Sequence, residues 1–256
     1  MKQNNSRIDK LEKLLSCKIQ KKINFGLSLE KYEAIYDNQK VLLRIFDDIY
    51  FNDRYLREGI AIRKLSKSSD PSDIIIPKII QEWPEYGVRA IEWFDMSHNL
   101  SPNQIKSSLT WLNQQRFKFP YNLQDDLINH LSNLDQLHPS YVDFFSSHSR
   151  NILKLINWSS GDNTFLHGDF HINNLARFND AIIIYDFEYA TYGSHFYNNA
   201  QIQSSVNHDI GGNIPIEWQL LVSLTNLHWF LQEHNFSPKE SLTNIELISS
   251  LSKNLY

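Results

Sequence analysis

Four oxygen-bearing side chains lie close together within residues 165–190. They are Asp169, Asn174, Asp186 and Glu188, which supply three carboxylates and one amide. The apolar run Ala181–Ile184 directly precedes Tyr185 and Asp186, and it is typical of a buried strand that would deliver this carboxylate. Carboxylate and amide oxygens are hard ligands that suit Mg²⁺, and a further carboxylate beside them can act as a base. The pattern therefore favours magnesium-assisted phosphoryl transfer.

Composition excludes several other classes of protein. The chain has 256 residues, of which 41% are hydrophobic, so it is long enough for a substantial core in one or two domains. Its net charge is −4, with 25 basic and 29 acidic residues, so we expect no nucleic-acid partner and no anionic membrane surface. The single cysteine, Cys17, cannot form a disulfide within the chain. We therefore expect an inert thiol and a reducing compartment.

The N-terminal segment predicts a short amphipathic helix over residues 7–16, with apolar residues at helical spacing. It lacks the continuous apolar core of a signal peptide, and no run in the sequence approaches the length of a membrane span. We therefore expect a cytoplasmic protein without a membrane partner.

The first part of the chain predicts a small antiparallel sheet with one helix. Alternating apolar residues favour strands over residues 23–29, 32–36 and 41–46, and Asp37-Asn38 is a turn signal between the last two. An apolar stripe predicts a helix over residues 53–67. Two further strands are expected within residues 74–80 and 88–94. Together these elements would form a five-stranded sheet.

Helical patterns dominate after residue 94. Ser101-Pro102 is a good helix start, because serine caps a helix and proline suits its first position. Leucine-rich periodicity predicts the remaining helices over residues 121–138, 141–158, 218–231 and 241–255. The oxygen-rich motif would lie on short strands among them. We expect two domains, an N-terminal lobe of residues 1–94 and a helical lobe of residues 95–256, joined near residues 92–96.

The spacing of the motif supports a more specific interpretation. His167-Gly168-Asp169 is followed by Asn174 and then by Asp186-Phe187-Glu188, and this resembles the catalytic signature of the aminoglycoside phosphotransferase and choline kinase superfamily. The likeness covers most of the chain, because the two-lobe order also fits. It implies an α+β, bilobal, protein-kinase-like fold, with a small antiparallel-sheet lobe for the nucleotide and a larger, mostly helical lobe for catalysis. It also implies ATP and Mg²⁺ as cofactors.

The resemblance assigns roles within the motif. Asp169 would be the base that accepts or orients the proton of an acceptor hydroxyl. Asn174 and Asp186 would bind the metal, and Glu188 would have a supporting metal or water role, although it could also be a turn residue. His167 would orient the loop, and His171 would make supporting hydrogen bonds.

The resemblance also implies a phosphate-binding site in the N-terminal lobe. Arg44 would meet the α- and β-phosphates, and Glu58 would hold it in an ion pair, with Arg57 as a competing charge on the same helix. Gly26 and Ser28 resemble the phosphate loop, although Phe25 and Leu29 stand where the family often has glycine and asparagine.

The same likeness places the adenine beside the junction between the lobes. Glu92, Trp93 and Phe94 would form this hinge, with backbone groups that read the adenine edge.

The acceptor is indicated by the residues around and after Asp186. Residues 186–190 resemble choline, ethanolamine and thiamine kinases, which implies a small hydroxylated cation, and aromatic residues such as Tyr192 and Trp229 could form its pocket. An aminoglycoside or another sugar-like acceptor is the enzymatic alternative. A catalytically silent nucleotide- or ligand-binding protein is the other alternative, since Leu29 and Asn198 depart from the family pattern. The sequence leaves the choice between ATP and GTP and the oligomeric state open.

Overall fold

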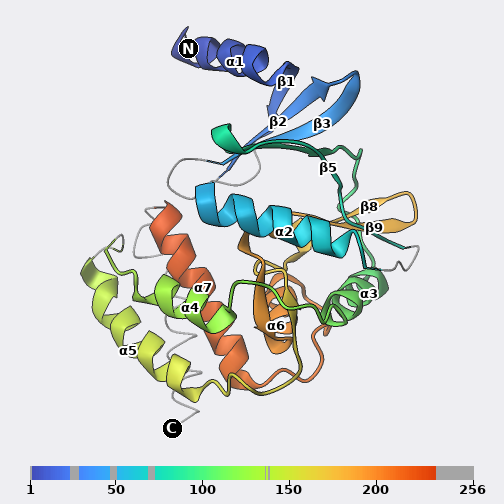
Figure 1. The fold of residues 1–256 in the computed structure, drawn as a ribbon. Helices are drawn as coiled ribbons and strands as arrows, with labels where there is room; N and C mark the ends of the chain where they lie inside the picture. The colour runs from blue at the N-terminus through green and yellow to red at the C-terminus, as the bar shows by residue number, and fades with distance from the viewer. Residues whose placement is uncertain are drawn as a thin grey trace. The chain divides into compact units, whose positions relative to one another are not determined.

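The computed structural model describes residues 2–23, 29–46, 51–68, 73–135, 137 and 139–234 (Figure 1). Its contacts divide the chain into two compact units. The sheet unit comprises Met1–Leu100 with Leu175–Tyr189, and the helical unit comprises Ser101–Asn174 with Ala190–Tyr256. The expected division of function between residues 1–94 and 95–256 stays a prediction. None of the described helices is both long enough and apolar enough to cross a membrane.

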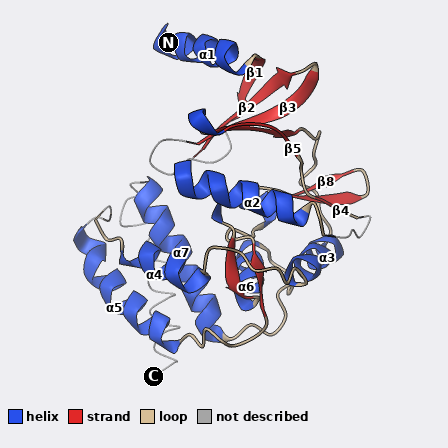
Figure 2. Cartoon of the chain, in the orientation of Figure 1, coloured by secondary structure: helices blue, strands red, loops and turns tan. Residues whose placement is uncertain are grey.

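The sheet unit contains a five-stranded antiparallel sheet (Figure 2). Its strands, in spatial order, are β1 (Cys17–Ile23), β2 (Leu29–Tyr36), β3 (Gln39–Phe46), β6 (Val88–Glu92) and β5 (Ile79–Trp83). Asp37 and Asn38 join β2 to β3, and both have positive φ, 48° and 60°. A two-residue turn of this kind matches the twist of the strands, and Asp and Asn tolerate it. The predicted turn is confirmed.

The first strand lies earlier in the chain than the sequence indicated. We expected it over residues 23–29, whereas β1 is Cys17–Ile23 and Leu29 opens β2; residues 24–28 lie outside the described residues. A bulge between Ile19 and Lys21 breaks the alternation of β1, and its exposed lysines hide the strand pattern. Lysines are common on edge strands because they discourage pairing with another chain. Burial, followed by the charge of Glu12, raises the pKa of the Cys17 thiol to about 11, which keeps it protonated and unreactive.

A second correction concerns residues 74–80, which do not add one continuous strand to this sheet. Ile74–Ile75 forms β4, which pairs in parallel with β9 (Ala181–Ile184), and β9 pairs in turn with β8 (Leu175–Phe178). Only β5 joins the five-stranded sheet. Local periodicity cannot reveal a parallel partner so distant in sequence, because such pairing depends on tertiary context. The consequence is that β9, which leads to Asp186, is held between two strands.

Two helices and two short helical turns complete the described part of the sheet unit before residue 100. They are α1 (Lys2–Leu15), a π-helical turn (Phe51–Tyr55), α2 (Leu56–Leu65) and a 3₁₀ turn (Pro84–Tyr86). The helix predicted over residues 53–67 is therefore present, but its α-helical part is limited to Leu56–Leu65. The inner face of α2 buries Ala61, Ile62 and Leu65, but it also buries Arg57 and Glu58. Charged side chains are seldom buried without partners, so this face marks a site rather than simple packing.

The helical unit contains five described helices and a two-stranded sheet (Figures 1 and 2). The helices are α3 (Pro102–Asn113), α4 (Leu123–Ser132), α5 (Pro139–Leu155), α6 (Phe196–Ser205) and α7 (Ile216–His234), and the strands are β7 (Asn163–Leu166) and β10 (Thr191–Ser194). Ser101 caps α3 and Pro102 opens it as expected, and Gln104 completes a capping box that the sequence analysis did not predict. Pro139 begins α5, as suits proline at a first helical turn. The helix expected over residues 241–255 lies outside the described residues.

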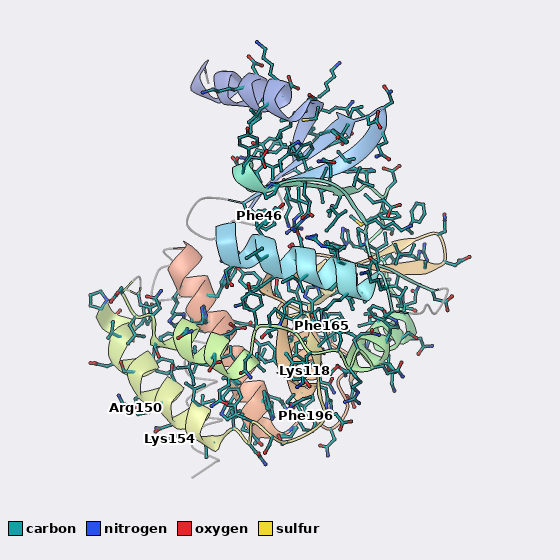
Figure 3. All side chains as sticks on the ribbon, viewed as in Figure 1. Phe46, Lys118, Arg150, Lys154, Phe165 and Phe196 are labelled. Atoms are coloured by element: carbon teal, nitrogen blue, oxygen red, sulfur yellow. The ribbon has the colours of Figure 1, made fainter. Side chains whose placement is uncertain are left out.

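The core of this unit is built mainly from α4, α5 and α7. Figure 3 shows Arg150 and Lys154 on the outer side of α5, where both are exposed, whereas Phe165 of β7 is fully buried. His228 of α7 is also fully buried, with its ring centroid 4.5 Å from that of His130 on α4 and 5.0 Å from that of Phe145 on α5. Burial, followed by the proximity of His130, lowers the pKa of His228 to about 4.

Because the pKa of His228 is lowered, we predict that the protein loses stability in mild acid. A lowered pKa means that the unfolded chain takes up the proton first as the pH falls from about 6.5 to about 4. The free energy of unfolding should therefore fall through this window, by at most about 1.4 kcal/mol per pH unit from this residue. Urea titrations across the window should show a shallower slope for His228→Leu than for the wild type. His208→Gln, at an exposed position, is the control and should keep the wild-type slope.

Equal slopes for His228→Leu and the wild type would contradict the role of His228. If the leucine variant does not fold, an NMR titration of the wild-type imidazole gives the same answer. A measured pKa near 6.5 would then exclude the effect.

Candidate active site

Asp186 is the centre of the site in the sheet unit. It follows β9 in a left-handed backbone conformation, with φ of 72°, which turns the chain directly after the strand. Its carboxylate meets two cations: Arg44 Nη2 donates to Oδ1 at 2.5 Å, and Lys31 Nζ donates to Oδ2 at 2.6 Å. Burial alone would raise the pKa of Asp186, but Arg44 and Lys31 outweigh it and hold the pKa well below its usual range. Asp186 is thus a permanent carboxylate.

Arg44 is in turn held by the predicted ion pair with Glu58. Arg44 Nη2 lies 3.1 Å from Glu58 Oε1, and neither side chain is exposed. Burial would lower the pKa of Arg44, but Asp186 and then Glu58 reverse the effect and raise it. The competing Arg57 pairs with Asp53 instead, with 2.9 Å between Nη2 and Oδ2. The ion pair between Arg44 and Glu58 is confirmed, while the roles of both residues toward a nucleotide stay predictions.

Arg89 is a site residue that the sequence analysis missed. It lies on β6 directly opposite Arg44 on β3, is fully buried, and places Nη1 2.8 Å from Glu58 Oε2. It also donates to Glu82 and to the carbonyl of Tyr55. Space for its guanidinium depends on Gly59, where an added Cβ would lie 2.5 Å from Arg89 Nη2. The signal in the sequence was a charged residue inside the apolar strand Val88–Glu92.

Glu188 is buried two residues beyond Asp186, in a 3₁₀ turn formed by Phe187–Tyr189. Its Oε2 lies 3.8 Å from Arg44 Nη2. Burial, followed by the negative charge of Asp186, raises the pKa of Glu188 to about 7. Arg44 therefore faces one permanent carboxylate at Asp186 and one that gains a proton near neutral pH. The supporting metal role of Glu188 stays a prediction.

The helical unit holds Asp169 and Asn174 on the loop after β7. Asp169 is 42% exposed by its side chain, and its Oδ2 accepts a hydrogen bond from Asn174 Nδ2 at 3.1 Å. Asn174 Nδ2 also donates to the Asp169 carbonyl at 2.8 Å, so the amide nitrogen faces inward. Within the described residues, nothing donates to Asn174 Oδ1, which leaves that oxygen available as a metal ligand. His171 Nε2 lies 3.2 Å from Asp169 Oδ2.

One face of α6 holds the backbone of this loop. Asn198 Oδ1 accepts the amide of His167 at 3.2 Å, and Ser205 Oγ accepts the amide of Ile172 at 3.0 Å. Gln201 lies between them, accepting the amide of Phe170 at 3.0 Å and donating to the carbonyl of Gly168 at 2.7 Å. These three side chains lie at helical spacing on one face. Asn198 thus supplies an acceptor to the loop even though it departs from the family pattern.

The sequence analysis singled out Asn198 only because it departs from the family pattern. It predicted no role for Gln201 or Ser205. The available signal was a set of polar residues with spacings of three and four, on a helix that also carries other polar residues such as Asn199 and Gln203. Such a set ordinarily indicates a solvent-exposed face. Here Asn198 is fully buried and Gln201 is 6% exposed, so the set faces inward.

The hinge and phosphate-loop predictions fall on different parts of the chain. Gly26 and Ser28 lie outside the described residues. Glu92 ends β6, and its amide donates to the carbonyl of Lys78 at 2.8 Å. Lys40 Nζ lies 4.3 Å from the ring centroid of Trp93, and the rings of Phe94 and Phe178 meet edge to face at 5.1 Å. Contact with an adenine stays a prediction for all three hinge residues.

The predicted acceptor residues are both partly buried in the helical unit. Tyr192 lies on β10, and Trp229 lies on α7. Both residues are partly accessible to solvent, but they belong to separate elements. Their place in one pocket stays a prediction.

The ligand set fits Mg²⁺ in chemical type. Asp186 and Glu188 in the sheet unit and Asn174 in the helical unit offer only oxygen ligands, which suit Mg²⁺ and not Zn²⁺. Across the described part of the chain, no group of three or more His, Cys, Asp or Glu residues gathers as a ready-made metal cage.

The chain resembles known proteins in structure, but its sequence matches none of those compared. Neither a protein-family model nor a curated protein sequence matches the chain. Among solved structures, choline kinase LicA from Streptococcus pneumoniae is similar with a TM-score of 0.69 at 10% identity, covering 99% of this chain and 100% of that one. The chain has the fold of small-molecule kinases.

Two further solved structures are similar to the chain over nearly its whole length. A choline/ethanolamine kinase family protein from Mesorhizobium loti has a TM-score of 0.66 at 16% identity, covering 97% of this chain and 94% of that one. Amicoumacin kinase hAmiN, in complex with AMP-PNP, Ca²⁺ and Ami, has a TM-score of 0.67 at 15% identity, covering 99% and 96%. The predicted α+β, protein-kinase-like fold, with an antiparallel-sheet N-terminal part and a helical C-terminal part, is confirmed.

The α6 contacts generate a testable prediction. Gln201→Leu leaves the amide of Phe170 and the carbonyl of Gly168 without their partner, and unsatisfied buried polar groups cost about 1–3 kcal/mol each. The contact to the Gly168 carbonyl is only partly buried and water can replace it, so we count the buried amide of Phe170 alone. We therefore expect the free energy of unfolding to fall by about 1–3 kcal/mol, as measured by chemical denaturation. Gln124→Leu, at an exposed position on α4, is the matched control and should change it little. Equal effects of the two substitutions would show that α6 does not hold the loop.

Proposed function

We propose that this protein is an ATP- and Mg²⁺-dependent phosphotransferase that phosphorylates a hydroxyl group of a small molecule. The observation that supports it most is the difference between two carboxylates of the motif. Asp169 is accessible and orientated by a neighbouring amide, as a base for an incoming hydroxyl must be. Asp186 is buried between cations and always ionised, as suits an electrostatic role. This separation, in the fold of small-molecule kinases, favours phosphoryl transfer over simple ligand binding.

In this mechanism, Asp169 receives the hydroxyl of the acceptor. Its Oδ2 is engaged by Asn174, whereas Oδ1 accepts no hydrogen bond from any described residue. Oδ1 can therefore take the proton from the acceptor hydroxyl. The hydroxyl oxygen of the acceptor would then attack the γ-phosphorus in line with the leaving nucleoside diphosphate. The hydrogen bonds from α6 to the loop fix the direction in which the carboxylate points. Correct orientation of this kind lowers the entropic part of the barrier.

Arg44 would bind the phosphates of the nucleotide. Its Nε and Nη1 are buried and make no hydrogen bond within the described residues, and buried donors of this kind are costly until an acceptor arrives. Phosphate oxygens are suitable acceptors for a guanidinium. Glu58, fixed by Arg89, holds Arg44 in place. Asp186 in the sheet unit and Asn174 in the helical unit are each implied as Mg²⁺ ligands by the family resemblance, and Mg²⁺ would neutralise part of the phosphate charge.

The acceptor we favour is a small amino alcohol of the choline or thiamine type. The likeness of residues 186–190 to choline, ethanolamine and thiamine kinases supports it, together with the aromatic rings of Tyr192 and Trp229, which can attract a cation. Similar solved structures include proteins described as choline kinases. An aminoglycoside or sugar-like acceptor is the second candidate, because a complex of streptomycin, ATP and APH(2")-IIa has a similar structure, with a TM-score of 0.61.

The deciding experiment is a screen for acceptor-dependent ADP release with ATP and Mg²⁺. The acceptors are choline, ethanolamine, thiamine, aminoglycosides and small sugars. We expect at least one amino alcohol to stimulate ADP release and to gain a phosphate, as detected by mass spectrometry. Stimulation only by aminoglycosides or sugars would select the second candidate. Nucleotide binding without stimulation by any acceptor would favour the silent alternative.

The role of Asp169 is tested by Asp169→Ala. Loss of a positioned base should lower turnover by about 10²–10⁴-fold, while nucleotide affinity stays close to that of the wild type. Asp180→Ala, in the exposed turn between β8 and β9, is the control and should keep wild-type turnover. Comparable turnover of Asp169→Ala and wild type would remove Asp169 from the mechanism.

A further inference from the structure

Lys31 is a buried lysine that the sequence analysis did not single out. It lies within β2 and is only 8% exposed. Lysines are almost never buried without a partner, and within the described residues the partner of Lys31 is Asp186 alone, 2.6 Å away. A buried lysine in a strand next to the predicted phosphate loop therefore needs an explanation.

The strand register places Lys31 beside Arg44. The two residues are directly opposite each other in the pairing of β2 with β3. Directly opposite residues of antiparallel strands project from the same face of a sheet. Both side chains end on the carboxylate of Asp186, one on each oxygen. The structure thus holds two like charges side by side, which repel unless an anion lies between them.

The two cations differ in how firmly they are held. Arg44 is fixed by Glu58 as well as by Asp186, and its side chain is not exposed at all. Lys31 has the Asp186 contact only, its side chain is 10% exposed, and its four-carbon stem is flexible. A metal cation that takes an oxygen of Asp186 would repel the ammonium group of Lys31 at short range. Lys31 is therefore the cation that moves, and once it has moved it requires another anion.

We propose that Lys31 is a phosphate-binding residue that exchanges Asp186 for a phosphate oxygen of the nucleotide when the metal-bound nucleotide enters. This inference rests on the proposed function and names a second phosphate-binding cation beside Arg44. Arg44 Nε and Nη1 support it independently, because these buried donors on the same face of the sheet make no hydrogen bond within the described residues and could take further phosphate oxygens. The alternative is that Lys31 serves only to neutralise Asp186.

The test measures binding of ADP and of adenosine by calorimetry, in Mg²⁺, for the wild type and Lys31→Met. We expect the variant to bind ADP about 10- to 100-fold more weakly, the effect of losing one charge-assisted hydrogen bond. Its affinity for adenosine should equal that of the wild type, because adenosine has no phosphate. Lys31→Arg should recover most of the ADP affinity, since it restores the charge. Lys18→Met, at an exposed position on β1, is the matched control and should bind both ligands as the wild type does.

Unchanged ADP affinity in Lys31→Met would overturn the proposal and leave Lys31 as a neutralising partner of Asp186. An equal loss of ADP and adenosine affinity would also overturn it, because the variant would then disturb the sheet unit as a whole. If Lys31→Met does not fold, Lys31→Gln gives the same comparison with a polar side chain. Failure of the wild type to bind ADP or GDP would instead refute the proposed function, so the two failures are distinguishable.

Discussion

Glu58 is the residue on which the sheet unit depends most, because its carboxylate lies between two fully buried guanidinium groups. One oxygen faces Arg44 and the other faces Arg89. A buried charge is costly to remove from water, and the cost is offset only when the partners are close and well placed. A single carboxylate that serves two cations must therefore be fixed in position, and α2 fixes it through the buried face that includes Gly59. The position of Arg44, and through it the surroundings of Asp186, follow from this arrangement.

In the helical unit, neutral side chains rather than charged ones hold the loop that carries Asp169 in position. Side chains from α6 hold backbone amides and a carbonyl of this loop, residues 167–172, in place. Neutral hydrogen bonds carry a smaller desolvation cost than ion pairs, which suits a loop whose carboxylate at Asp169 must stay accessible. One unit thus positions its charges by ion pairs, and the other positions the loop that carries Asp169 by amide and hydroxyl groups.

The sequence predicted what depends on residue type and short spacing. The turn at Asp37-Asn38, the N-cap at Ser101 and the oxygen-rich motif around Asp169 all have local causes, and a local pattern reveals them. The pair of Arg44 and Glu58 was predicted only through the family resemblance. Gly26 and Ser28 lie outside the described residues, so their role is untested.

Interactions between distant segments could not be predicted in the same way. The pairing of β4 with β9 joins segments more than a hundred residues apart, and the lysines of β1 hid an edge strand behind a polar composition. Arg89 looked like an ordinary strand charge and Lys31 fell between two predicted strands, because their burial depends on strand register and on carboxylates of other elements. Gln201 looked like a surface residue until its partners in the loop were visible.

The long separation between the members of the Asp186 cluster has a consequence for the order of folding. Lys31 and Arg44 lie 155 and 142 positions before the carboxylate that they share, and a long stretch of chain also separates β4 from β9. During synthesis the N-terminal strands emerge first, but until residues 175–189 arrive Lys31 lacks its counter-charge and Arg44 has only Glu58 among the described residues. The unit that begins the chain therefore completes its folding only when most of the chain has left the ribosome. Contacts of such high sequence separation slow folding, so the sheet unit should be the slower of the two units to reach its native contacts.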